Sequence, residues 1–118
     1  MKITFFSGPE CSGKTKVATA IAEMVGNKEK TVWIDSRNFK KHDSFFLGDC
    51  NVNTELVIFD NFSSNFLDFL LDYVYNGKLK VEKKFCSPFF INANIIITTT
   101  DDIDINSEKY TVIKFPIH

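Results

Sequence analysis

An octapeptide near the N-terminus restricts the possible folds of this chain more than any other segment. It reads Gly8-Pro9-Glu10-Cys11-Ser12-Gly13-Lys14-Thr15 and fits the pattern G-x-x-x-x-G-K-[ST] in full. The residues before it, Lys2 to Ser7, read as a short buried strand. The residues from Lys14 to about Val25 carry apolar side chains at helical spacing. A strand, a glycine loop and a helix in this order are the context that the pattern requires.

Each fixed position of the octapeptide has a role in binding phosphate groups. Gly8 and Gly13 allow the backbone to curl so that successive N–H groups point at phosphate oxygens. The positive end of the following helix favours the same anions. Lys14 can reach the β- and γ-phosphates, and the Thr15 hydroxyl can ligate Mg²⁺. We therefore predict that residues 8–15 bind ATP with Mg²⁺, the alternative being a glycine turn that matches the pattern by chance.

A carboxylate follows the most apolar stretch of the chain. Leu56-Val57-Ile58-Phe59 is an uninterrupted apolar run, as expected of a central parallel strand, and it ends in Asp60. We predict that Asp60 holds Mg²⁺ through water, the alternative being a cap on the next helix. Asn61 stands where many ATPases of this type carry an acid that activates the attacking water. An amide orients water but cannot accept its proton, and the loss of a general base costs about 10²–10⁴-fold.

A second apolar run ends in three threonines. Ile95-Ile96-Ile97 continues into Thr98-Thr99-Thr100, and we predict that one of these threonines senses the γ-phosphate. Ordinary β propensity is the alternative reason for threonine at a strand end. The aspartates that follow, at positions 101, 102 and 104, favour a solvated loop over a second metal site. The candidate catalytic residues are Lys14, Asp60, Asn61 and Thr100.

The remaining segments complete an α/β pattern. Thr31–Asp35 is a predicted strand, and Ser63 or Ser64 can cap a helix that runs to about Tyr75. Leu79 and Val81 alternate with lysines, which predicts an exposed strand of a hairpin that returns through residues 89–91, and a last strand includes residues 112–113. Residues 45–47 are predicted to form a short helix or to fill the core. Strands that alternate with helices in this way predict a mostly parallel sheet.

Length and composition narrow the class further. With 118 residues, of which 44% are hydrophobic and 25% charged, the chain is predicted to form one folded domain, residues 1–118. A net charge of -1 excludes a wholly basic nucleic-acid-binding surface but leaves room for a local basic patch. No apolar run is long enough to span a bilayer, the N-terminus has no signal-peptide pattern, and the three cysteines are widely spaced. We therefore expect no membrane partner and a cytoplasmic location, in the host cell if the chain is viral or phage-encoded.

Four segments, taken in order, resemble a known family. The octapeptide, the run ending in Asp60-Asn61, the lysine-rich residues 76–84 and the run ending in Thr100 are similar to motifs A, B, B′ and C of superfamily three helicases, the AAA+-related motors of small viral and plasmid replication proteins. The resemblance covers residues 2–100. It implies a P-loop NTPase fold with three α/β/α layers, a five-stranded sheet in the order 5-1-4-3-2 and a β-hairpin insertion.

The resemblance also points to a second ligand. In that family the lysines of motif B′ lie on a hairpin that grips single-stranded DNA, which by position implies Lys80, Lys83 and Lys84. The residues themselves leave two readings open, because a local basic patch and the protection of an exposed edge strand both use lysines.

Three departures from the family pattern bear on activity. Asn61 replaces an acid, Thr100 replaces an asparagine, and the only arginine, Arg37, precedes Asp60 instead of following motif C as an arginine finger would. A finger contributes about 10³–10⁵ in rate. We therefore expect an ATP-binding domain with slow hydrolysis, either a replication-associated ATPase or the remnant of a DNA-binding motor, acting with a larger replication protein or as a homo-oligomer. The alternatives are a non-hydrolysing nucleotide-binding module that regulates a larger replication complex and a small nucleotide kinase, which a single arginine disfavours.

Overall fold

The fold is built around one parallel sheet and one smaller antiparallel sheet. A computed structural model describes residues 1–25, 28–40 and 43–116. Short 3-10 helices span Lys28–Lys30, Ser36–Asn38 and Ser64–Phe66. The other elements are β1 (Ile3–Ser7), α1 (Lys14–Val25), β2 (Thr31–Asp35), β3 (Leu56–Asp60), α2 (Leu67–Leu71), β4 (Val74–Tyr75), β5 (Lys78–Val81), β6 (Phe89–Ile91), β7 (Asn94–Thr99) and β8 (Thr111–Lys114).

The large sheet has the strand order that the sequence predicts. Its order is β2-β3-β7-β1-β8 and all neighbouring pairs are parallel. Numbered along the chain, these strands stand in the predicted order 5-1-4-3-2, read from the β8 edge. Ile97 of β7 lies opposite Phe5 on one side and opposite Phe59 on the other. The strand that ends in the three threonines therefore separates the strand of the octapeptide from the strand of Asp60, as predicted.

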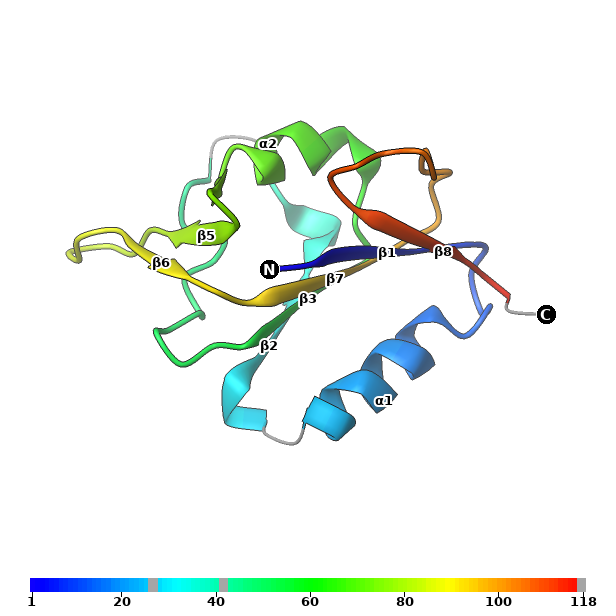
Figure 1. Ribbon diagram of the computed structural model, residues 1–118, viewed down its shortest axis with the longest axis horizontal. Helices are drawn as coiled ribbons and strands as arrows, with labels where there is room; N and C mark the ends of the chain where they lie inside the picture. Colours follow the sequence, from blue (N-terminus) through cyan, green and yellow to red (C-terminus); the bar gives the residue numbers. More distant parts are fainter. Residues whose placement is uncertain (26–27, 41–42, 117–118) are drawn as a thin grey trace.

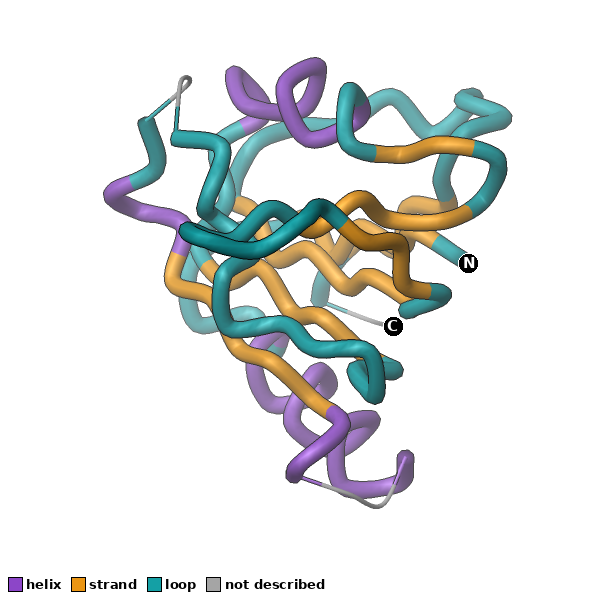
Figure 2. The backbone as a smooth tube through the Cα atoms, turned by 90° about the vertical axis from the view of Figure 1, so that its left-hand side faces the viewer, coloured by secondary structure: helices purple, strands orange, loops and turns teal. Residues whose placement is uncertain are grey.

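Helices cover both faces of this sheet. Figure 1 shows α1 below the strands and α2 with the small sheet above them, and the tube view in Figure 2 shows the strands between two layers of helix. On the α1 face, Ala18 packs with Phe6 and Ile58, all of them buried. The predicted three-layer α/β/α arrangement is confirmed.

A cluster of phenylalanines fills the other face of the sheet. The fully buried ring of Phe59 lies with its centroid 5.9 Å from that of Phe39, 6.2 Å from that of Phe46 and 6.0 Å from that of Phe62. The pairs with Phe39 and Phe62 are edge-to-face, and pairs of this kind stabilise a core beyond the area that they bury. Residues 45–47 do not form a helix. Leu47 is fully buried among these rings, so this segment fills the core.

The predicted helix from Ser63 or Ser64 to Tyr75 is wrong in its length. The side chain of Ser63 caps the start, but α2 ends at Leu71 and Val74–Tyr75 forms a strand. The reason is the dipeptide Asn76-Gly77, whose φ angles of 51° and 74° make a tight hairpin turn with the sense of twist that antiparallel strands require. Asn and Gly also commonly end helices, which is why the sequence pattern predicts a helix up to Tyr75.

The predicted hairpin is part of a three-stranded antiparallel sheet. The order is β4-β5-β6, which makes β5 the central strand. Leu79 and Val81 are fully buried, while the alternate positions Lys78 and Lys80 lie on the other face. The prediction of an exposed strand is therefore wrong, and so is the reading of its lysines as guards of an open edge. Within the described part of the chain, no helix is long and apolar enough to cross a membrane.

Candidate functional site

The octapeptide connects β1 to α1 and takes its shape from two backbone features. Gly13 has a φ of 97° and Cys11 a φ of 60°, so the chain passes through the left-handed region twice before the helix begins. At the start of the loop, the Gly8 N–H donates to the carbonyl of Thr99, 3.2 Å away. A Cβ on Gly8 would lie 2.5 Å from the carbonyl oxygen of Phe115. The loop therefore starts in close contact with the segment that follows β8.

Lys14 forms hydrogen bonds to two carbonyl groups of the loop. Its Nζ donates to the carbonyl oxygens of Gly8, at 2.5 Å, and Pro9, at 2.6 Å. Although it carries a charge, the residue is 8% exposed. A buried ammonium requires such partners, because an unpaired charge away from water is costly. The ammonium group is thus held inside the curve of the loop.

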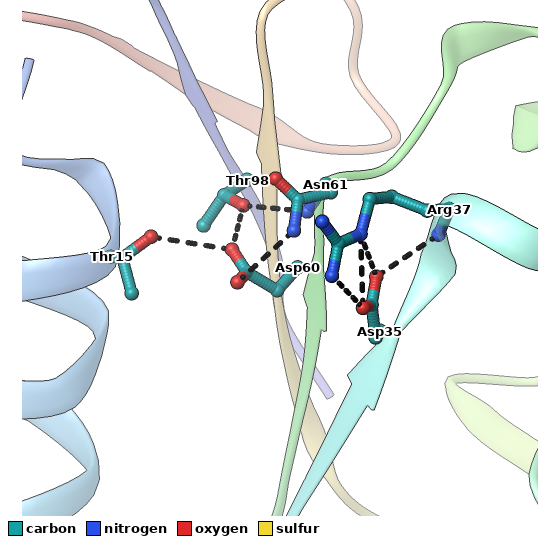
Figure 3. Close-up of polar contacts among 6 residues, drawn as sticks. All are labelled: Thr15, Asp35, Arg37, Asp60, Asn61 and Thr98. Atoms are coloured by element: carbon teal, nitrogen blue, oxygen red, sulfur yellow. Dashed lines mark hydrogen bonds and ion pairs between the residues drawn. The ribbon is translucent and has the colours of Figure 1, made fainter. Parts of the chain in front are cut away.

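Asp60 is the centre of a hydrogen-bond network at the carboxyl end of the sheet. Its Oδ1 accepts from Thr98 Oγ1 at 2.5 Å and from Thr15 Oγ1 at 3.3 Å (Figure 3). The Asn61 side-chain amide donates to Asp60 Oδ2 at 3.4 Å, and the Asn61 backbone N–H donates to Thr98 Oγ1 at 3.1 Å. Parallel strands bring β3 and β7 to the same edge, and the first turn of α1 faces them. The structure therefore brings together Thr15, Asp60 and Asn61, which the sequence singled out.

The three threonines at the end of β7 have different positions. Thr98 is buried and contacts Asp60, while Thr99 is buried and its Oγ1 accepts from the Asp101 backbone N–H at 3.0 Å. Thr100 is exposed and lines the cleft beside the octapeptide. Thr98 orients Asp60, and of the three Thr100 is the exposed residue at the cleft, which keeps its predicted sensor role open.

Asp101 has a structural role that the sequence analysis missed. Its carboxylate accepts from the Ser64 backbone N–H at 2.7 Å, and its carbonyl accepts from Ser7 Oγ at 2.6 Å. It therefore ties the end of β1 to the start of the helical segment after β3. The available signal was an acid at the end of a parallel strand and a serine pair at a helix start. Asp102 is exposed and pairs with Lys114, in line with the predicted solvated loop.

Arg37 is a second residue whose place at the site could not be read from the sequence. It follows β2 and forms a two-pronged ion pair with Asp35, with an Nη2–Oδ2 distance of 2.5 Å. The hydrogen bonds from Arg37 lower the pKa of the Asp35 carboxyl, and the hydrogen bond to Asp35 raises the pKa of Arg37. Asp35 lies opposite Asp60 in the register of β2 and β3. The only arginine of the chain is therefore at the same edge of the sheet as the octapeptide.

These elements surround a cleft of about 680 Å³. This volume lies within the range of about 300–1,000 Å³ that is common for small-molecule sites. The cleft is lined by octapeptide residues and Lys16 on one side, by Arg37 and residues 61–63 on another, and by residues 98–101 at the strand end.

The three candidate DNA-binding lysines lie away from this cleft. The loop between β5 and β6 projects at the left of Figure 1, whereas the octapeptide lies at the right. The Nζ atoms of Lys80, Lys83 and Lys84 lie about 6 Å from the ring centres of Tyr75, Phe89 and Phe45, at 5.9, 5.9 and 6.0 Å. The structure thus places the predicted nucleotide and nucleic-acid residues at opposite ends of the molecule.

Comparison with known proteins supports a helicase-like fold. No family model and no curated protein matches the chain. Among solved structures, it is similar to the apo A form of the NrS-1 C-terminal region, with a TM-score of 0.61 and 16% identity over 98% of this chain and 28% of that one. It is also similar to JCV helicase with a bound acetamide compound, with a TM-score of 0.65 and 20% identity over 97% of this chain and 35% of that one. The chain thus spans about a third of the length of the structures it matches.

Proposed function

We propose that this chain is a P-loop domain that binds ATP with Mg²⁺ in the cleft beside the octapeptide. The observation that carries the proposal is the meeting of a loop lysine, a helix hydroxyl and a strand carboxylate at one edge of a parallel sheet. Lys14 lies inside the loop, and Thr15 Oγ1 is 3.3 Å from Asp60 Oδ1. Ligands of open α/β sheets bind beyond the carboxyl ends of the strands, where these groups lie.

The oxygen groups at this edge suit Mg²⁺. Magnesium takes oxygen ligands, and at nucleotide sites it is usually held by one or two carboxylates together with the substrate phosphates. The Thr15 hydroxyl and the Asp60 carboxylate supply this chemistry, and Thr98 fixes the orientation of the carboxylate. Across residues 1–25, 28–40 and 43–116, no three His, Cys, Asp or Glu residues lie close enough together to hold a metal ion by themselves, without a nucleotide. When bound, Mg²⁺ would neutralise charge on the phosphate oxygens.

The same residues support slow hydrolysis. Asn61 can orient a water molecule, but its amide does not accept a proton, and its Nδ2 already donates to Asp60. Arg37 lines the cleft, but Asp35 holds its guanidinium. We infer that an efficient reaction requires an arginine from a larger replication protein or from a second copy of the chain.

A non-hydrolysing nucleotide-binding module that regulates a replication complex is the second candidate. The observation that favours it is the hydrogen bond from Asn61 to Asp60. The residue that follows β3 is an amide already engaged with the carboxylate, so it cannot act as the general base of hydrolysis. A small nucleotide kinase fits less well, because β7 separates β1 from β3 whereas a kinase-like P-loop fold makes those strands neighbours.

The cysteines give a direct test of nucleotide binding at the octapeptide. Cys11 is exposed within the loop, Cys86 is exposed in the β5–β6 loop, and Cys50 is buried with its pKa raised by burial to about 11. We expect Mg-ATP at 100 times its Kd to slow alkylation of Cys11 by roughly tenfold or more, because the bound phosphates cover the loop. Rates of iodoacetamide labelling, followed by peptide mass spectrometry, measure this effect.

Cys86 is the internal control for that experiment. The β5–β6 loop that carries it lies at the far end of the molecule from the octapeptide (Figure 1), so its labelling rate should not respond to nucleotide. The buried Cys50 should label slowly throughout. If Cys11 keeps its labelling rate at saturating Mg-ATP, or if Cys86 is protected to the same degree, nucleotide does not bind at the octapeptide.

We also propose single-stranded DNA as a second ligand, through Lys80, Lys83 and Lys84. These residues follow one another on β5 and the loop after it, and Glu82 is the only acid between residues 74 and 91. Contact with three or four phosphates predicts that the logarithm of the affinity falls with the logarithm of salt at a slope of roughly -2 to -3.

A further inference from the structure

The small sheet has an outer face whose composition its fold does not explain. Its inner face carries Leu79, Val81 and Ile91, which are all buried. The alternate positions therefore point to the other side, and they are occupied by Tyr75, Lys78, Lys80 and Phe90. The solvated side of an antiparallel sheet is normally polar. Here two of the four positions are aromatic.

The two aromatic rings lie next to each other and remain open to solvent. Tyr75 is 49% exposed and Phe90 is 51% exposed. Their ring centroids are 5.9 Å apart and the rings are almost perpendicular, at 84°. Tyr75 comes from β4 and Phe90 from β6, so the pair spans the central strand. The two rings form one continuous aromatic surface of which about half faces water.

Lysines alternate with these rings. Lys78 lies opposite Tyr75 in the sheet register, and Lys80 lies opposite Phe90. The Lys80 Nζ is 5.9 Å from the centre of the Tyr75 ring and 3.3 Å from Glu82, so one acid offsets part of the charge. With Lys83 and Lys84 in the following loop, this corner holds four cations in a chain whose net charge is -1. A surface with lysines beside solvent-exposed aromatic rings suits a ligand that carries both phosphates and planar bases.

We propose that Tyr75 and Phe90 form a stacking platform for the bases of single-stranded nucleic acid, with Lys78 and Lys80 holding the adjacent phosphates. The proposal rests on the single-strand binding proposed above and deepens it, because it assigns the recognition of bases to residues that the lysine motif does not include. Sequence-tolerant single-strand sites combine a cationic track with aromatic side chains in this way. A protein partner fits less well, because lysine is depleted at protein interfaces.

The position of the platform makes it separable from nucleotide binding. Figure 1 shows the β5–β6 hairpin at the opposite end of the molecule from the start of α1. Changes to the outer face of the small sheet should therefore leave the protection of Cys11 by Mg-ATP intact. This protection also reports that a variant is folded.

The decisive experiment uses the unmodified chain and two oligonucleotides that differ only in their bases. We expect oligo-dT to bind at least tenfold more tightly than an abasic strand of the same length and charge, because each stacked base contributes about five- to 150-fold in affinity. Fluorescence anisotropy with labelled strands measures both affinities. Oligo-U in a parallel measurement separates RNA from DNA, and the preference for oligo-dT over the abasic strand is the result that supports the platform.

Substitutions test which residues cause the preference for a base-containing strand. Tyr75→Thr with Phe90→Thr, which keeps β-branched residues in both strands, should remove the preference for oligo-dT over the abasic strand. Trp33→Thr removes a 42% exposed ring from β2 and should preserve this preference. Lys78→Gln should reduce by about one the steepness with which the logarithm of affinity falls with the logarithm of salt, while the preference for the base-containing strand remains.

Two outcomes overturn the proposal in distinguishable ways. If the unmodified chain binds oligo-dT and the abasic strand equally, or if the Tyr75/Phe90 variant keeps the preference while Cys11 protection shows that it is folded, the platform is wrong and the lysine contact stands. If the unmodified chain binds no oligonucleotide even at low salt, the proposed single-strand binding fails and the platform fails with it.

Discussion

The purified chain should turn over ATP no faster than about 10⁻⁴ times per second. A typical enzyme turns over about ten times per second, the loss of a general base removes a factor of at least about 10², and the loss of an arginine finger removes a factor of at least about 10³. One is the acid at the position of Asn61, whose amide donates to Asp60. The other is an arginine finger, because Asp35 holds the side chain of Arg37. A phosphate-release assay with Mg-ATP, run with sedimentation on the same sample, measures the rate and the oligomeric state.

Replacement of Asn61 by an acid gives the matched variant. Asn61 has a φ of 57°, a left-handed conformation that aspartate tolerates better than glutamate. Asn61→Asp is therefore the variant that preserves the backbone, and we expect it to raise turnover modestly, since the finger is still missing. Turnover of several per second by the unmodified monomer would contradict this account, and no detectable turnover under any condition would favour the non-hydrolysing module.

Lys14→Ala should weaken Mg-ATP binding by about 100-fold. The ammonium lies inside the loop, where it can form charge-assisted hydrogen bonds to phosphate oxygens, and two such bonds contribute about 3 kcal/mol. The hydrogen-bond partners of Lys14 lie in the loop itself and not in the core, so the fold should persist. Isothermal titration calorimetry gives both affinities, and circular dichroism checks the fold.

Lys30→Ala is the control for that substitution. Lys30 precedes β2 at the other edge of the sheet and pairs with Glu55 at 3.4 Å, an exposed contact of little energetic consequence. Its loss should leave nucleotide affinity unchanged. Equal affinities of the Lys14→Ala protein and the unmodified chain would remove the octapeptide from the binding site.

Much of the fold could be predicted because its signals are local. The octapeptide defines the junction of β1 and α1, and the apolar run before Asp60 identifies a strand that is covered on both faces. The order of the strands is not a local property, and it was predicted through the family resemblance. The turn at Asn76-Gly77 shows the limit, because the same dipeptide can end a helix or close a hairpin. Pairing with β5 decides between the two.

The same contrast between local signals and contacts from distant residues applies to the candidate site. The placement of Lys14, Thr15 and Asp60 at one end of the sheet was predictable, because the octapeptide joins β1 to α1 and Asp60 ends another parallel strand. Arg37 and Asp101 were not, because their roles depend on neighbours that the sheet register brings to them from distant parts of the chain. Thr98 is one of three threonines that are equivalent in the sequence, and only its contact with Asp60 distinguishes it from the other two.

The contact between Gly8 and Phe115 affects how mutagenesis of the octapeptide has to be interpreted. Any side chain at position 8 collides with the backbone after β8, so Gly8→Ala displaces an edge of the sheet whether or not a nucleotide binds. A loss of function in that variant would report a packing defect. Gly13 has no atom within 4 Å of an added Cβ, and its φ of 97° is the only obstacle. The two glycines look equivalent in an alignment of motifs, yet only Gly13 reports on the conformation of the loop itself.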